Sequence, residues 1–195
     1  MSLFQTLPLD LVNLLELHCE SFPVRYTLRT MHNSMDRRML SLVLCHRDGA
    51  CNEEIIGCAI SRRSWKNFTT TDRKACLCTF GIKEQFRRLS LGTDLLTVAC
   101  AILWGHFQTE ELYLDMQSMN RAAYLFYTKF GFKVWEAKPG YYDLPEPGSD
   151  AWYMDIPLEN VEFHLKNMIY MKRRSRALLK KVPPLEWKKS LFASP

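Results

Sequence analysis

Residues 75–96 read ACLCTFGIKEQFRRLSLGTDLL, and the rest of the chain is interpreted outward from this stretch. The alternation of side chains over 76–82 predicts a strand. A basic connection follows at 83–90, and an apolar helix runs on from Gly92. This order, with small residues where the helix begins, leaves backbone N–H groups free for an anion, which a helix N-terminus favours by roughly 0.3–1 kcal/mol. The stretch therefore predicts a phosphate-binding site.

Three interpretations of this loop compete. The simplest is an ordinary strand-to-helix junction with two solvated arginines. A Walker loop would end in Gly-Lys-Ser/Thr and a dinucleotide fingerprint would carry three glycines, and neither pattern is present. The third is the acyl-CoA pyrophosphate loop, Arg/Gln-x-x-Gly/Ala-x-Gly/Ala, which residues 87–92, RRLSLG, fit with Ser90 in the first small position. In this loop the chain resembles the GNAT acetyltransferase superfamily.

A second motif lies further along the chain. Residues 120–132 read NRAAYLFYTKFGF, where Asn120 predicts a helix N-cap and Gly131 a C-terminal cap. The run is similar to the superfamily signature Asn-x-x-Ala-x-x-x-Tyr-x-x-x-Gly-Phe. This resemblance implies that Asn120 contacts the cofactor and that Tyr127 lies beside the CoA sulfur.

The remaining elements predict an α+β fold, a mixed sheet flanked by helices. Their order matches the GNAT fold, and we expect a GNAT domain over 1–158 and a basic amphipathic tail over 159–195. Gly57 lies inside a predicted strand, which permits a bulge or a close approach of another segment. Strands are expected at 39–46, 54–62, 76–82, 111–117, 132–135 and 151–156, and helices at 6–21, 92–106, 120–130 and from Leu158 onward.

The resemblance implies acetyl-CoA as the cofactor. The strand end, the loop and the first turn of the following helix would bind its phosphates and pantetheine arm, together with two residues of the second motif. The implied cofactor-binding residues are Phe80, Gly81, Ile82, Arg87, Arg88, Leu89, Ser90, Leu91, Gly92, Thr93, Asn120 and Tyr127.

Three short patterns narrow the resemblance to N-terminal acetyltransferases of the NatE and NatF kind, NatE being closer. They are FPVRY at 22–26, LYL at 112–114 and YYDLPEP at 141–147. In that family the first pattern shapes the pocket for the first substrate residues, an initiator Met among them, and the last clamps the peptide backbone. The resemblance thus implies one wall made by Phe22, Pro23, Val24 and Tyr26, and a facing wall made by Tyr141 and Tyr142. Rigid aromatic side chains suit such walls, although ordinary core packing is the alternative for the tyrosines.

The chain departs from this family where the chemistry is expected. The family has a Tyr and a His that deprotonate the substrate amine through a water, and Cys76 and Asp115 stand in their positions. Asp115 serves as the base if burial raises its pKa, because a carboxyl group near pKa 4 is a poor base for an amine of pKa about 8. Cys76 is a candidate nucleophile, although a buried strand cysteine is the simpler interpretation. With Tyr127 these two form the predicted catalytic set.

The sequence therefore predicts a transferase that moves an acetyl group directly from acetyl-CoA to the α-amine of Met-initiated protein N-termini. Two alternatives remain open. The missing Tyr and His favour a catalytically weakened acetyl-CoA-binding subunit of an N-terminal acetyltransferase complex. A lysine or small-amine acetyltransferase is the other, and the Tyr141–Tyr142 pair counts against it.

Composition indicates one globular domain and a soluble, cytoplasmic protein. The chain has 195 residues, 47% of them hydrophobic, which suffices for one core. No apolar run approaches the roughly 20 residues of a membrane span, and no leader opens the chain. The seven cysteines form no Cys-x-x-Cys pair, so reduced thiols are expected and neither disulfides nor a metal site.

The charge is concentrated in the tail. Of the net +5, residues 159–195 hold nine Lys and Arg against three Glu, a net +6, which leaves −1 for residues 1–158. Besides a solvated helix, a basic tail with Trp187 and Phe192 fits an anionic membrane surface or ribosomal RNA. A partner subunit, the ribosome, a peripheral membrane position and a nuclear location are all open alternatives for this protein.

Overall fold

The computed structural model describes residues 2–5, 39–47, 53–63, 73–144 and 148–160. These form a seven-stranded sheet in the order β1-β2-β3-β4-β5-β7-β6, with two α-helices and two short 3-10 turns. The elements are β1 (Ser2–Gln5), β2 (Met39–Arg47), β3 (Glu53–Arg63), β4 (Lys74–Ile82), η2 (Glu84–Phe86), α3 (Leu91–Gly105), β5 (Glu111–Gln117), α4 (Arg121–Phe130), β6 (Lys133–Lys138), β7 (Ala151–Pro157) and η3 (Leu158–Asn160).

The sheet is mixed, as the sequence predicts. Strands β1 to β4 are antiparallel neighbours, β5 pairs in parallel with β4, and β7 lies between β5 and β6 in antiparallel pairing. Helix α3 makes the crossover that a parallel β4–β5 pair needs. Strand β1 was not predicted, because four residues are too few to display a period.

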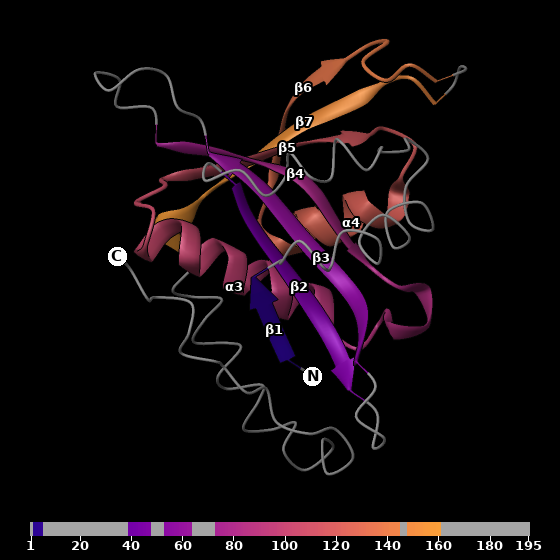
Figure 1. The fold of residues 1–195 in the computed structure, drawn as a ribbon. Helices are drawn as coiled ribbons and strands as arrows, with labels where there is room; N and C mark the ends of the chain where they lie inside the picture. Colours follow the sequence, from indigo (N-terminus) through magenta and orange to yellow (C-terminus); the bar gives the residue numbers. More distant parts are fainter. Residues whose placement is uncertain (1, 6–38, 48–52, 64–72, 145–147, 161–195) are drawn as a thin grey trace.

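Helices α3 and α4 lie on the same side of the sheet, behind β2, β3 and β4 in Figure 1. Helix α3 is apolar over most of its surface and packs against strand residues such as Leu42 and Leu112. Helix α4 is amphipathic: Tyr127 and Phe130 are buried, whereas Leu125 is exposed. Together they form one hydrophobic core with the sheet.

Gly57 provides the close approach that the sequence suggested. A Cβ at this position of β3 would lie 2.5 Å from Ile82 Cδ1 and 3.1 Å from the Gly81 carbonyl oxygen. A side chain at this position would therefore push against the end of β4, and this strand end leads into the phosphate loop.

Several predictions lie outside the described residues: the helix at 6–21, the wall at 22–26 and nearly all of the tail. The helix expected from Leu158 begins, within the described part, as the 3-10 turn η3. All five cysteines of the described residues are free thiols. No helix among the described residues is long and apolar enough to cross a membrane.

Candidate active site

Strands β4 and β5 separate in the middle of the sheet. Their parallel ladder has three pairs and ends at Cys76 and Tyr113, although β4 continues to Ile82 and β5 to Gln117. At the same place the β3–β4 register shifts between Ile60 and Ser61, which leaves Cys78 as a bulged residue of β4. Beyond Cys76 the edge of β4 that faces β5 therefore has no ladder partner in the described sheet.

The loop at 87–90 ends at a helix N-terminus with unpaired donors. Ser90, the residue before α3, is left-handed, with φ of 62°, and its side chain makes no capping hydrogen bond. The first intrahelical bond from this turn is donated by the Asp94 N–H to the Ser90 carbonyl, so the three preceding N–H groups point outward from the helix end. Arg87 Nε donates to the Ile82 carbonyl at 2.9 Å, which anchors this exposed side chain beside the same turn.

Phe80 links the phosphate loop to α4. Its ring stacks on Phe126 with centroids 5.4 Å apart and lies 6.1 Å from the ring of Tyr127. A Cβ on Gly92 would lie 3.4 Å from Phe126 and 3.6 Å from Phe80. The fold thus brings predicted cofactor residues from β4, α3 and α4 to one place, the start of α3.

The two residues of the second motif have defined local roles. The Asn120 side chain accepts a hydrogen bond from the Ala123 N–H at 3.0 Å, the predicted N-cap. Gly131 ends the helix at φ 121°, the predicted C-terminal cap. Burial raises the pKa of Tyr127 well above its usual range, so its hydroxyl group stays protonated and is a donor.

Asp115 holds the Tyr141–Tyr142 turn. Its Oδ2 accepts a hydrogen bond from the Tyr141 hydroxyl at 2.9 Å, and its backbone carbonyl accepts one from the Tyr142 hydroxyl at 3.0 Å. Its Oδ1 accepts from Lys138 Nζ at 2.6 Å, and that ammonium group also lies over the rings of Tyr141 and Tyr153. Both carboxylate oxygens of the predicted base are therefore already engaged.

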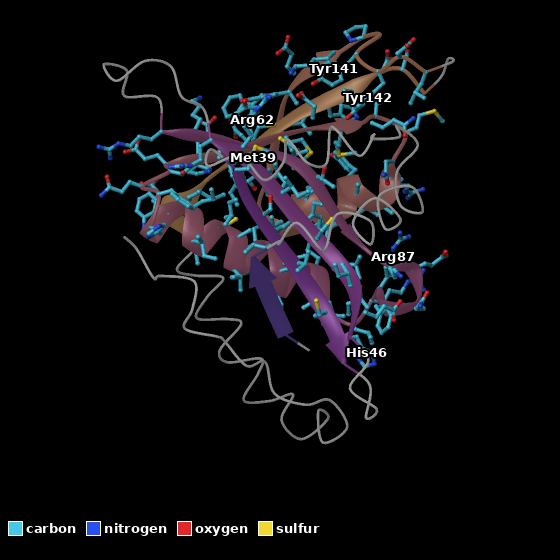
Figure 2. The ribbon with its side chains drawn as sticks, viewed as in Figure 1. Met39, His46, Arg62, Arg87, Tyr141 and Tyr142 are labelled. Atoms are coloured by element: carbon cyan, nitrogen blue, oxygen red, sulfur yellow. The ribbon has the colours of Figure 1, made fainter. Side chains whose placement is uncertain are left out.

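Burial, with the hydrogen bond to Asp115, raises the pKa of Tyr141 to about 12, so this tyrosine remains a donor. In Figure 2, Tyr141 and Tyr142 lie close together beside β6 and β7, well away from Arg87 at the phosphate loop. The predicted phosphate loop and the tyrosine turn are therefore well separated in this view.

Cys76 has neighbours that the sequence did not indicate. Arg62 of β3 and Tyr113 of β5 are its register partners on either side. The Cys78 thiol donates a hydrogen bond to the Cys76 carbonyl oxygen at 3.6 Å. No sequence pattern identifies Arg62, Tyr113 or Lys138 as site residues, because only strand pairing brings them there.

These features agree with the family comparison. The acetyltransferase (GNAT) family model matches residues 11–132 of the sequence, well over half of it. The chain belongs to the acetyltransferase (GNAT) family. The predicted α+β GNAT fold is thereby confirmed.

Several curated proteins similar to this GNAT chain are named N-alpha-acetyltransferase. The protein of that name from Sulfurisphaera tokodaii is 32% identical over 110 residues, which are 54% of this chain and 64% of the archaeal protein. N-alpha-acetyltransferase 50 of Danio rerio is 33% identical over 88 residues, 45% of this chain and 52% of the fish protein. The aligned part of the chain thus spans less than two thirds of these relatives.

Solved structures show the same GNAT fold. NAA60 of Arabidopsis thaliana, in complex with acetyl-CoA, has a TM-score of 0.67 at 18% identity, covering 80% of this chain and 98% of that one. Naa50 of the same plant, in complex with a bisubstrate analogue, has a TM-score of 0.62 at 23% identity, covering 79% and 96%. At these identities the likeness concerns the fold.

Proposed function

We propose that this GNAT chain transfers the acetyl group of acetyl-CoA to the α-amine of protein N-termini. One observation carries the proposal: β4 and β5 open between a phosphate-type loop at one end and the Asp115-anchored turn of Tyr141 and Tyr142 at the other. An acyl carrier with a phosphate tail and a peptide approaching from the tyrosine side would meet in this opening. The curated relatives named N-alpha-acetyltransferase support the choice of acceptor.

The residues at the loop fit acetyl-CoA. The outward N–H groups of the first turn of α3 and the exposed Arg87 and Arg88 suit a pyrophosphate, which backbone donors and guanidinium groups bind together. Gly92, without a Cβ, leaves room beside the Phe80–Phe126 stack. The remaining loop residues of the predicted set, Gly81, Ile82, Leu89, Leu91 and Thr93, would line the same site.

The reaction is direct transfer. The neutral amine attacks the thioester carbonyl carbon, the carbon–sulfur bond breaks, and the CoA thiolate leaves. Tyr127, which burial keeps protonated, is suited to donate its hydroxyl proton to that thiolate. The amine must first lose a proton, and for this step the sequence offered Asp115 and Cys76. Because both oxygens of Asp115 hold other groups, we assign it to positioning the tyrosine turn.

We also propose that the enzyme prefers peptides that begin with Met. Tyr141 and Tyr142 would hold the substrate backbone, and Phe22, Pro23, Val24 and Tyr26, which lie outside the described residues, would shape an apolar pocket for an initiator Met. A Met side chain needs such a pocket because it is unbranched and apolar.

A peptide library tests the proposal. Peptides that differ in the first two residues are incubated with acetyl-CoA, thiol release is recorded, and mass spectrometry locates the acetyl group. We expect acetylation of the α-amine, with Met-initiated peptides preferred. Acetylation confined to lysine side chains would favour the lysine acetyltransferase. Acetyl-CoA binding without any product would favour a weakened subunit.

We also propose that the basic tail, residues 159–195, binds peripherally to an anionic membrane surface that faces the cytoplasm. Its net charge of +6 supports this, since each Lys or Arg near such a surface contributes about 1 kcal/mol. Co-sedimentation with anionic vesicles, with and without the tail, tests it. If the protein does not bind vesicles in a salt-sensitive way but binds ribosomes, the membrane proposal is contradicted.

A further inference from the structure

We propose that the substrate peptide continues from the Tyr141–Tyr142 turn along a strip of the sheet face, and that Arg62 at the far end binds an acidic side chain of the substrate. The strip consists of four residues, Tyr153, Tyr113, Cys76 and Arg62. This inference rests on the proposed function and deepens it, because it adds a preference for substrate residues beyond the first two. Arg62 would then determine part of the substrate specificity.

Strand register places the strip on one face of the sheet. Arg62 of β3 pairs with Cys76 of β4, and Cys76 pairs with Tyr113 of β5. Side chains of register partners stand on the same face of a sheet. Tyr153 of β7 joins this row through its ring, whose centroid lies 5.5 Å from that of Tyr113. Four neighbouring strands thus contribute to one continuous strip.

The strip lies on the face opposite helices α3 and α4. The alternate residues of the same strands are buried in the core that the helices share, among them Ala75, Leu112 and Met154. The strip residues are instead partly exposed, and Arg62 is exposed. On β3 the same face is buried at Ile60, two residues before Arg62. The accessible part of this face therefore ends at Arg62.

The other end of the strip meets the tyrosine turn. Lys138 Nζ lies 5.1 Å from the centre of the Tyr141 ring and 4.7 Å from the centre of the Tyr153 ring. Asp115, which bonds this ammonium group, is the register partner of Tyr153. In Figure 2, Arg62 and Tyr141 both lie in the upper part of the view. A peptide whose first residues lie at the turn therefore meets the strip next.

Arg62 is a cation without a counter-ion in the part of the chain that the structure describes. The ion pairs found there join other basic side chains to acids, and none includes Arg62. Two nearby acids of the same face are engaged: Asp115 bonds Lys138, and Asp155 accepts from the Trp135 indole N–H. An exposed guanidinium group binds a carboxylate through two parallel hydrogen bonds. The charge therefore favours an acidic side chain at this end.

The tyrosines of the strip and the turn do not oppose an acidic ligand. Burial raises the pKa of Tyr113, Tyr141 and Tyr153 to about 12, so their hydroxyl groups stay protonated and neutral. They offer rigid aromatic surface and hydrogen-bond donors to a peptide. The charge preference along the strip is therefore set by Arg62.

The length of the strip determines where the acid lies in the substrate. The strands follow in the order β3-β4-β5-β7, and neighbouring strands lie about 4.8 Å apart, so three steps cover about 14 Å. An extended peptide rises about 3.3 Å per residue and covers this distance with about four residues. Because the first residues occupy the tyrosine turn, we expect the acidic side chain beyond the third position of the substrate.

A series of peptides tests the assignment with the full chain. The peptides begin with Met and carry Glu, Gln or Lys at one position between the third and the eighth, and kcat and KM of α-amine acetylation are measured. At one or two adjacent positions beyond the third, we expect KM to be about three- to fivefold lower for Glu than for Gln, as for an exposed ion pair. The preference should weaken at high salt.

Substitutions of Arg62 separate charge recognition from a structural role. Arg62→Gln should give equal KM values for the Glu and Gln peptides, and Arg62→Lys should keep part of the preference. Arg62→Glu should reverse it in favour of the Lys peptides, which damage to the fold would not do. Arg73→Gln is the matched control with the wild-type preference, because the exposed Arg73 already bonds Glu110 at 2.9 Å.

Peptide binding gives a readout that does not need turnover. Fluorescence anisotropy of peptides labelled at the C-terminus, measured with CoA present, should show the same preference for Glu. If Glu and Gln peptides bind equally at every position, or if Arg62→Gln keeps the preference, the role of Arg62 is overturned while α-amine acetylation stands. If no peptide binds and none is acetylated, the proposed function fails and this inference with it.

Discussion

Asp115 and Tyr141, 26 residues apart in the chain, are joined by a 2.9 Å hydrogen bond from the tyrosine hydroxyl to the carboxylate. The same carboxylate holds Lys138, whose ammonium group lies 5.1 Å from the centre of the Tyr141 ring. Three groups from β5, β6 and the following turn are therefore fixed to one another. Together with the bond from the Tyr142 N–H to the Ser149 carbonyl at 2.7 Å, this connection holds the tyrosine turn beside the exposed edge strand β6.

Asp115→Asn should loosen that turn. The amide oxygen still accepts one hydrogen bond, but the ion pair with Lys138 is lost, which at this partly exposed site amounts to about 1 kcal/mol. We expect the peptide KM to rise about fivefold and kcat to change by less than about threefold. Asp143→Asn, an exposed residue of the same turn, is the control. A fall in kcat of about 100-fold or more would instead make Asp115 the base.

Gly92→Ala should weaken cofactor binding while preserving the fold. The added methyl group would lie at ordinary contact distance from Phe126 and Phe80, so the core tolerates it, yet it narrows the space at the start of α3. We expect the acetyl-CoA Kd to rise about tenfold, or 1.4 kcal/mol, with Tm nearly unchanged. Calorimetry measures the first and thermal unfolding the second. An unaltered Kd would place the cofactor elsewhere.

Ser90→Gly should stabilise the chain. Ser90 has a left-handed backbone, which disfavours residues with a Cβ, and its side chain makes no capping bond. We expect the free energy of unfolding in urea to rise by up to about 1 kcal/mol and acetyl-CoA affinity to be retained. Ser90→Val should lower stability. Loss of stability in the glycine variant would count against this account of the loop.

Gly57→Ala should destabilise the junction between β3 and β4. Its methyl group would meet the Gly81 carbonyl oxygen at 3.1 Å and the Ile82 side chain at 2.5 Å, so the backbone of β4 must shift. Overpacking of this kind costs about 1–3 kcal/mol, or several degrees of Tm. Gly105→Ala is the matched control, because no atom lies within 4 Å of its added methyl group. Equal Tm values for both variants would refute the close approach.

Tyr127→Phe should slow the chemical step without loss of the cofactor. We expect kcat to fall about tenfold or more and the acetyl-CoA Kd to stay within about twofold. Tyr124→Phe, on the exposed side of the same helix, is the control. Because burial raises the pKa of Tyr127, its proton is present below that raised value and is lost only above it. Wild-type kcat should therefore show no decline from this residue between pH 7 and 10.

The local sequence predicted an element correctly where its residues have a clear period or a capping residue. Strand β5 has the predicted bounds, 111–117, because its apolar residues alternate strictly. Helix α4 begins after Asn120 and ends before Gly131, as their capping chemistry predicts. The loop at 87–90 likewise ends at a helix N-terminus, where backbone donors are available whatever surrounds them. Strand β1 was missed because it depends on its neighbour β2 and has too few residues to show a pattern.

The sequence by itself determined the elements that have their own period or caps, the phosphate-type loop and the resemblance to acetyltransferases. These are local properties of the chain. Only the tertiary structure decided which side chains share the site. The register of β3, β4 and β5 brings Arg62 and Tyr113 to Cys76, and the register shift between Ile60 and Ser61 leaves Cys78 without a partner in β3. Strand register is fixed by packing across the whole sheet, so no stretch of sequence states it alone.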